Sequence, residues 1–453
     1  MMGSFLAFNG SIFADAAAAA SAESGASHFI DKWDGFVDHL GPEFNVVDDP
    51  IKVELGGQVR YRFEFRDDFN FNNAAFEDDG FSLLRTRLNA KVHLGDNIEL
   101  FAEGQDAESF AARAAHKAGI FANQLDLHQL YAKVDSPWEN LNASVKVGRQ
   151  KLSYGDQRLV GAFEWSNTAR VFDAVKLELT PSEKLKIDAW FSQVVAVNKK
   201  KPDSPTHKDN FYGIYTVLKP AKGHVLDTYI FLRDSRDQVF ASERAGKMGP
   251  RTEYTIGNRY NGEWKGFDFG YEGAWQFGVR GHDAIMAYAL HFQLGYTFEE
   301  IAGSPHLLAA YNHGSGDSDP TDGKFKNFDN LFPTNHLFYG YMDLANWSNM
   351  NNFKFQLDFN GPKKTKFIAA YHMFFLDTNN SAWTNAGGGA IRGPNSGAGT
   401  TVGQELDLVA KWKVGKHLSF LTGYSHFFAG DFISDTGADN DADFLYFQSV
   451  LTI

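Results

Sequence analysis

The clearest pattern in the chain is an alternation of apolar and polar residues that begins at Ile51. In the segment IKVELGGQVRYRFEFR, apart from Gly56 and Gly57, the odd positions are apolar or aromatic, and the even positions after Ile51 are polar or charged. Successive side chains of a β-strand point to opposite faces, so the segment predicts a strand with one apolar and one polar face. It is longer than the roughly 5–6 residues of a typical soluble strand, and a tilted membrane strand needs about 9–11.

The alternation recurs to the end of the chain and predicts eighteen strands in all. The number is even, as in single-chain outer-membrane barrels. The expected strands cover residues 51–66, 81–94, 97–106, 124–135, 141–149, 171–180, 184–195, 209–219, 224–234, 251–261, 264–279, 283–298, 305–314, 351–360, 364–377, 402–414, 417–429 and 442–453.

The connections between these strands alternate between short turns and long polar loops. The expected turns lie at 95–96, 136–140, 181–183, 220–223, 262–263, 299–304, 361–363 and 415–416. The expected loops lie at 67–80, 107–123, 150–170, 196–208, 235–250, 315–350, 378–401 and 430–441, and one short link at 280–282 breaks the rule. Outer-membrane barrels have short periplasmic turns and long external loops. We therefore predict an all-β, transmembrane antiparallel β-barrel of about 18 strands over residues 51–453, in the bacterial outer membrane with a periplasmic N-terminus.

The first 50 residues follow a different pattern. Residues 1–26 predict a signal-peptide remnant, and the alternative is a disordered Ala-rich segment. Residues 27–41 predict a short amphipathic helix, with Ser27 as its N-cap and Gly41 at its end. The sequence contains no run of about 18 apolar residues, so it predicts no transmembrane helix.

Composition and charge exclude several classes of function. The net charge is −13, which argues against nucleic-acid binding through counterion release, and the absence of cysteine excludes thiol chemistry and Cys-based metal sites. No hydrolase, P-loop or dinucleotide signature is present, so we predict no enzyme and no cofactor. Two acidic loops are expected to be solvated surface loops, and the alternative is that their carboxylates bind Ca²⁺. Their carboxylates belong to Asp317, Asp319 and Asp322, and to Asp435, Asp439, Asp441 and Asp443.

If the apolar positions face lipid, the polar positions face the lumen, and the first two strands carry an unusual density of arginine. Rings of Arg and Lys in a pore favour anions. We expect Arg85 and Arg87 to face water in this lumen. The alternative is that these charges form cross-strand ion pairs that only hold the wall together.

Two long segments resemble the alginate export family of outer-membrane porins. They are GRQKLSYGDQRLVGAFEWSNTARVFDAVKL (148–177) and FDNLFPTNHLFYGYMDLANWSNM (328–350), and the resemblance extends over most of residues 45–453. It implies an eighteen-stranded barrel whose Arg-lined constriction lets a uronic-acid polymer leave the cell. It also implies that the aromatic loop 328–350 packs over or into the mouth. Loop 150–170 is expected to form the constriction whatever solute passes through.

The strand pattern and the resemblance together give one set of candidate pore-lining and substrate-binding residues. In the first motif, Asp156 is the acidic counterweight to the basic residues. The full set is Arg60, Arg62, Arg85, Arg87, Lys91, Lys146, Arg149, Asp156, Arg158, Arg170 and Asp173.

The leading hypothesis is a passive, anion-favouring outer-membrane porin that exports an acidic polysaccharide or passes smaller organic anions. The alternatives are a general diffusion porin with structural lumen charges, and a structural or adhesion barrel plugged by its loops. Expected partners are outer-membrane lipid and lipopolysaccharide, the anionic solute, the outer-membrane assembly machinery and periplasmic export partners, with no nucleic acid.

Overall fold

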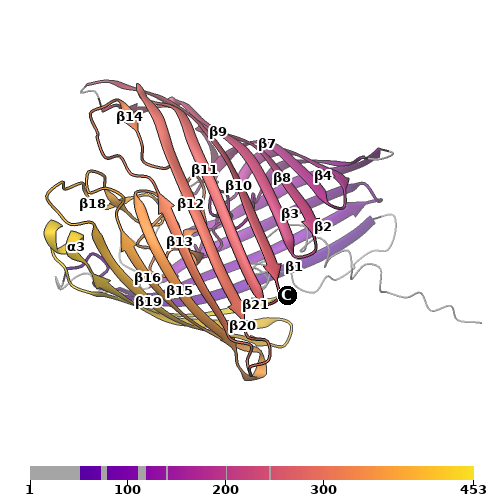
Figure 1. The fold of residues 1–453 in the computed structure, drawn as a ribbon. Helices are drawn as coiled ribbons and strands as arrows, with labels where there is room; N and C mark the ends of the chain where they lie inside the picture. The colour runs from indigo at the N-terminus through magenta and orange to yellow at the C-terminus, as the bar shows by residue number, and fades with distance from the viewer. Residues whose placement is uncertain (1–50, 73–78, 111–118, 139–140, 200, 244–245) are drawn as a thin grey trace, which may run out of the picture.

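The computed structural model describes residues 51–453 except 73–78, 111–118, 139–140, 200 and 244–245. Within these residues, eighteen long antiparallel strands form one barrel (Figure 1). The two-residue strand β14 pairs in parallel with the first residues of β12. The barrel is closed because β1 pairs with β2 on one side and with the last strand, β21, on the other. The predicted fold class is confirmed, whereas the expected helix at 27–41 and the segment 1–26 lie outside the described residues.

The eighteen barrel strands correspond one to one with those expected from the sequence. They are β1 (Ile51–Asp67), β2 (Asp79–Leu94), β3 (Ile98–Phe110), β4 (Asn123–Trp138), β5 (Leu141–Gln150), β6 (Phe172–Ser182), β7 (Leu185–Ala196), β8 (Ser204–Ala221), β9 (His224–Ala241), β10 (Met248–Trp264), β11 (Phe267–Arg280), β12 (Asp283–Thr297), β13 (His306–Gly314), β15 (Met350–Asn360), β16 (Thr365–Phe375), β19 (Thr401–Val414), β20 (Leu418–Ala429) and β21 (Ala442–Thr452). The remaining elements lie in the loops: β14 (Lys324–Phe325), β17 (Trp383–Thr384), β18 (Ala390–Arg392), the short 3₁₀ turns η2 (Asn335–Leu337) and η3 (Pro362–Lys364), and α3 (Asp431–Thr436). None of the helices in the described part of the chain is long and apolar enough to cross a membrane.

The outer surface of the barrel is apolar and the inner surface is polar. Leu88 and Trp275 are each 65% exposed, while their strand neighbours Arg87 and Gln276 are buried on the other face. Soluble proteins bury most of their large apolar side chains, whereas every strand of this barrel exposes some on its outer face. This exposure fits contact with lipid.

Two details of the strands differ from the sequence prediction. The expected turn at 262–263 lies instead at Lys265–Gly266, where both residues have positive φ (49° and 83°) and Trp264 pairs directly with Phe267. Two central residues with positive φ match the twist of a tight hairpin, which explains why the turn forms there. In addition, β8, β9 and β10 extend into the regions expected as loops 196–208 and 235–250.

Several inward-facing aromatic rings lie flat over a glycine on the neighbouring strand. Trp190 pairs directly with Gly213, Tyr229 with Gly257, and Tyr446 with Gly423. A Cβ atom at Gly213 would lie 2.1 Å from the Trp190 ring, so only glycine fits beneath it. These pairs fix the strand register on the inner wall.

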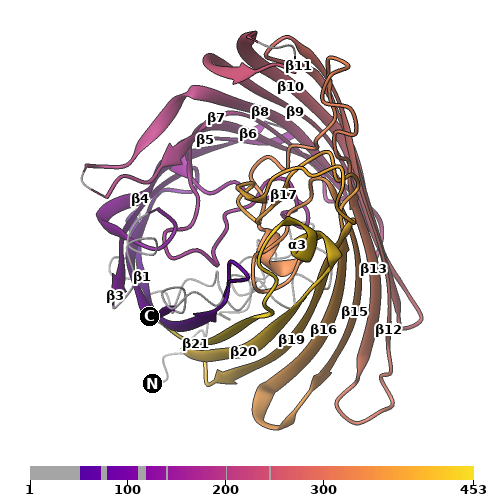
Figure 2. The same cartoon turned by 90° about the vertical axis from the view of Figure 1, so that its left-hand side faces the viewer.

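The long loops fold into the barrel and form a hydrophobic core there. Figure 2 shows β17, α3 and their loops within the outline of the barrel. Phe332 and Trp347, from the loop between β13 and β15, are buried with Val160 from the loop between β5 and β6, against Phe172 and Phe211 of the wall. Loop 328–350 is therefore packed inside, as expected, and the wall and the loops form one unit.

We predict that Leu408→Arg lowers the free energy of unfolding by roughly 2–4 kcal/mol, because Leu408 is 45% exposed on the lipid face near the middle of β19. Val414→Arg, on the same face at the end of the strand, should cost roughly 0–1 kcal/mol. Urea unfolding of the two variants in lipid vesicles measures both values. Equal costs at the two positions would contradict the assigned lipid face of β19.

Candidate pore constriction

The loop between β5 and β6, residues 151–171, crosses the interior of the barrel and is here called the constriction loop. One part of it, Glu164–Thr168, lies against strands β1–β3, and we name this part the strap. Another part, around Asp156 and Arg158, reaches strands β10–β13 on the other side. Because it is fixed to both walls, the loop spans the space through which a solute would pass.

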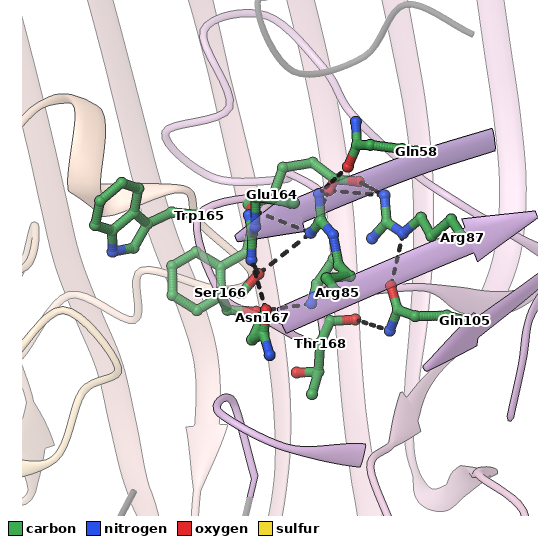
Figure 3. A network of polar contacts seen from close by, with 12 residues as sticks. Gln58, Arg85, Arg87, Gln105, Glu164, Trp165, Ser166, Asn167 and Thr168 are labelled. Atoms are coloured by element: carbon green, nitrogen blue, oxygen red, sulfur yellow. Dashed lines mark hydrogen bonds and ion pairs between the residues drawn. The ribbon is translucent and has the colours of Figure 1, made fainter. Parts of the chain in front are cut away.

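Backbone carbonyls of the strap are held by arginines of β1 and β2. The Arg60 guanidinium donates to the carbonyl oxygens of Glu164 at 2.7 Å and Ser166 at 2.9 Å, and to Asn167 Oδ1 at 3.0 Å. Arg85, which pairs directly with Arg60 across the two strands, donates to the same two carbonyls and to Gln58 Oε1 (Figure 3). The strap thus lies on a wall of guanidinium groups.

The Glu164 carboxylate is surrounded by cations. Its oxygens lie 3.0 Å from Arg85 Nη1, 2.9 Å from Arg87 Nη1 and 2.6 Å from Lys151 Nζ (Figure 3 shows the two arginines). Burial raises the pKa of Glu164, but the charges of Arg87, Lys151 and Arg85 outweigh it and lower this pKa well below its usual range. Glu164 is therefore ionised at neutral pH.

The strap is also fixed by neutral contacts. Asn167 donates through its amide to the backbone oxygens of Leu84, Glu108 and Phe121, and Gln105 donates to the Thr168 carbonyl at 2.9 Å. These bonds set the position of the strap along the wall, whereas the arginines neutralise its charge.

Arg62 occupies a different environment from its neighbours. It pairs with Glu64 at 2.7 Å, and its guanidinium lies 3.8 Å from the centre of the Trp165 ring. The other side of that ring stacks on His336 at 3.7 Å, which links the strap to the loop between β13 and β15. Arg62 thus joins the wall to both inward-folded loops.

The opposite end of the constriction loop is held by ion pairs of both signs. Asp156 lies 2.7 Å from Arg259, which also pairs with Asp227. Burial raises the pKa of Asp156, but Arg259 and Arg158 lower it to a net value below the usual range. The Arg158 guanidinium contacts His291 Nε2 at 3.0 Å and stacks on the Phe338 ring at 3.9 Å. Asp156 and Arg158 therefore both direct their charges at protein groups rather than at solvent.

The remaining residues of the family-like motif are also engaged with protein groups. Arg149 forms an ion pair with Asp173 at 2.8 Å. Arg170 donates to the carbonyls of Gly161 and Pro333, both at 2.9 Å, and burial, followed by the charge of Arg233, lowers the pKa of Arg170 to about 10.

Lysines line the inner wall on three adjacent strands, five or six residues from the strand ends that lead to the short turns. Lys133, Lys146 and Lys176 lie directly opposite one another on the adjacent strands β4, β5 and β6. Lys146 lies 4.1 Å from the centre of the Tyr131 ring, and no carboxylate forms an ion pair with it in the described part of the chain. Lys91 lies further round the wall, 3.6 Å from Glu54.

The expectation that Arg85 and Arg87 face water is wrong. They are 0% and 3% exposed, and Arg60 and Arg62 are 1% and 2% exposed, because the strap covers them. Sequence reasoning also missed Glu164, the residue that organises this cluster. Glu164 lies within the segment 148–177 that resembles the alginate export family. The sequence around a single loop carboxylate does not indicate which arginines it contacts in the fold.

The acidic loops make protein contacts of their own. Asp317 accepts the backbone N–H of Asp319 and of Lys326, and Lys326 lies 2.8 Å from Asp322. In the part of the chain that the structure describes, no group of His, Asp or Glu side chains has an arrangement that could hold a metal ion.

We predict that Glu164→Gln lowers the free energy of unfolding at neutral pH by about 3 kcal/mol, because two buried arginines and the half-buried Lys151 lose their carboxylate. The folded-state pKa of Glu164 is lowered, so its contribution is complete above the ordinary value of 4.5 and is lost as the pH falls through the lower folded value. Unfolding curves from pH 8 to pH 3 should therefore show wild type and variant converging below about pH 4.5. Glu183→Gln, in an exposed turn, is the control, and a difference that does not vary with pH would contradict the ion-pair assignment.

The comparisons with known proteins agree with this geometry. The family description for alginate export matches residues 51–447. The barrel is similar to solved structures of outer membrane protein OprD from Pseudomonas aeruginosa (14% identity, TM-score 0.58, 92% of this chain and 97% of that one) and of OccAB4 from Acinetobacter baumannii (11% identity, TM-score 0.58, 88% and 98%). OpdQ from Pseudomonas aeruginosa is similar to the same degree (12% identity, TM-score 0.58, 88% and 97%).

At these identities the structural likeness shows the fold, whereas the family match shows the lineage. The chain has no match among curated protein sequences. The chain therefore belongs to the alginate export family, and it is an outer-membrane transport channel of the porin type rather than an enzyme.

Proposed function

We propose that this channel passes anionic solutes, and that its main cargo is an acidic, uronate-type polysaccharide. The observation that carries the proposal is the excess of cations at the constriction. Arg85, Arg87 and Lys151 lie around the single carboxylate of Glu164, and Arg60 binds the backbone carbonyl of the same residue. Two unit charges 4 Å apart interact by roughly 1 kcal/mol in water and about 4 kcal/mol at a surface-like dielectric, so this excess attracts anions and repels cations.

The lysine row supports the same proposal from another part of the wall. Like charges placed directly opposite one another in a sheet are destabilising, yet Lys133, Lys146 and Lys176 stand side by side. Strands lie about 4.8 Å apart, so the ammonium groups can meet successive carboxylates of one polymer chain. Nearby acids keep each contact weak: Lys133 lies 3.1 Å from Asp135, and Lys176 pairs with Glu178.

A general diffusion porin is the second candidate, and specific contacts favour it. Arg149 with Asp173, Arg62 with Glu64, and Arg259 with Asp156 neutralise much of the inner wall. A loop-plugged barrel is the third candidate, because the constriction loop is fixed to both sides of the interior. Conductance separates the third candidate from the other two, and ion selectivity separates the first from the second.

The alternation of loop lengths supports a periplasmic N-terminus, as outer-membrane barrels place their short turns on that side. The end of the barrel with the short turns would then face the periplasm, where an exported polymer enters. The apolar outer band is a surface for outer-membrane lipid and lipopolysaccharide. We include the outer-membrane assembly machinery and periplasmic export proteins among the proposed partners.

Reversal potentials in planar bilayers under a KCl gradient test the proposal. The wild-type channel should favour Cl⁻, and oligouronate should block the current. Lys146→Gln should lower the anion-to-cation permeability ratio by roughly two- to threefold, because it removes an ammonium group that forms no ion pair with the described residues.

The double variant Arg149→Gln/Asp173→Asn is the matched control, since it removes an ion pair without changing the net charge. Its selectivity should equal that of wild type. An open but unselective wild-type channel would favour the general porin, and absence of conductance from folded protein would favour the plugged barrel.

A further inference from the structure

The strap offers the arginine wall the same chemical groups that a polyuronate chain carries. It contributes one carboxylate, from Glu164, and a row of neutral oxygen acceptors: the carbonyls of Glu164, Trp165 and Ser166 and the amide oxygen of Asn167. We propose that Arg60, Arg85, Arg87 and Lys151 form a binding site for uronate carboxylates. In the proposal the strap is the resident occupant of this site, and the polymer displaces it in order to pass. This inference rests on the proposed function.

Arg60 depends on the strap for its side-chain partners, and Arg85 and Arg87 depend on it for their carboxylate. Among the described residues, the Arg60 guanidinium donates hydrogen bonds only to acceptors of the strap, and Arg60 is 1% exposed. Arg60 and Arg85 lie directly opposite each other, an arrangement of like charges that needs acceptors between or above them. If the strap left without replacement, Arg60 would lose its side-chain acceptors and Arg85 its carboxylate. Departure of the strap is therefore coupled to arrival of another oxygen-rich anion.

The strap neutralises this wall only in part. It supplies one carboxylate for four cations, whereas a uronate oligomer supplies one carboxylate per sugar. A chain that engages several cations at once gains affinity through its linked groups. We therefore expect an oligouronate, and not a monomeric uronate or a neutral oligosaccharide, to compete effectively with the strap.

The backbone at both ends of the strap is strained. Phe163 and Ala169, which flank it directly, have φ values of 50° and 57°, a region that non-glycine residues rarely adopt. The contacts with the wall, rather than local backbone preference, hold the strap in place. Movement of the strap would relieve this strain, and the two residues are the natural hinge points.

The chain has no cysteine, so one introduced thiol can report on the strap. Ser166 is 3% exposed and Ser381, in the loop between β16 and β19, is 5% exposed. In Ser166→Cys, a decamer of uronate should raise the rate of alkylation by a small maleimide at least tenfold. The matched variant Ser381→Cys should stay unreactive, and monomeric uronate and a neutral decasaccharide should have little effect on either.

A second variant tests competition. Glu164→Gln in the Ser166→Cys background weakens the resident occupant, so the decamer concentration for half-maximal alkylation should fall about tenfold. If Glu164 instead only shapes the site, this concentration stays constant or rises. A constant or a higher decamer concentration would overturn the proposal. Heat-modifiable mobility on gels shows that each variant is folded.

The outcomes separate this inference from the proposed function. An unreactive Ser166→Cys in protein whose current the decamer still blocks would overturn the displaceable strap and leave the anion channel standing. A channel that is unselective and that the decamer does not block would overturn the proposed function itself, and the strap proposal with it.

Discussion

The interior of this barrel depends on the contact between one loop segment and a wall of arginines. Arg60 and Arg85 lie opposite each other on β1 and β2, where like charges repel, and the carbonyls and carboxylate of the strap lie over both. A buried guanidinium is stable only where acceptors surround it. The wall and the strap therefore need each other, and this requirement places the constriction loop across the lumen.

The other parts of the interior follow from that placement. Once the strap is fixed, Trp165 stacks between Arg62 and His336, and so ties the constriction loop to the loop between β13 and β15. The far end of the constriction loop meets Arg259 on the opposite wall. Aromatic side chains of the loops pack against the wall, and the pore takes its chemistry from loops as much as from strands. Charge is unevenly distributed as a result, with the cation excess concentrated beneath the strap.

The sequence predicted the barrel well because strand alternation is a local signal. Each of the eighteen strands lies where the period of two indicated, and the one displaced turn, at Lys265–Gly266, depends on backbone conformation rather than polarity. The site was predicted less well. Arg85 and Arg87 have the pattern of water-facing residues, and only a loop some 80 residues away along the chain covers them. Glu164 has no periodicity or spacing to mark it, since its role comes from three-dimensional contacts alone.

Efflux from proteoliposomes tests the central claim most directly. Vesicles containing the wild-type protein would be loaded with a fluorescent oligouronate and with a neutral oligosaccharide of the same length and a different label. The account predicts that the oligouronate leaves faster than the neutral chain and that high salt narrows the difference, because the selecting charges are screened. Equal efflux of both chains, or faster efflux of the neutral one, would contradict it.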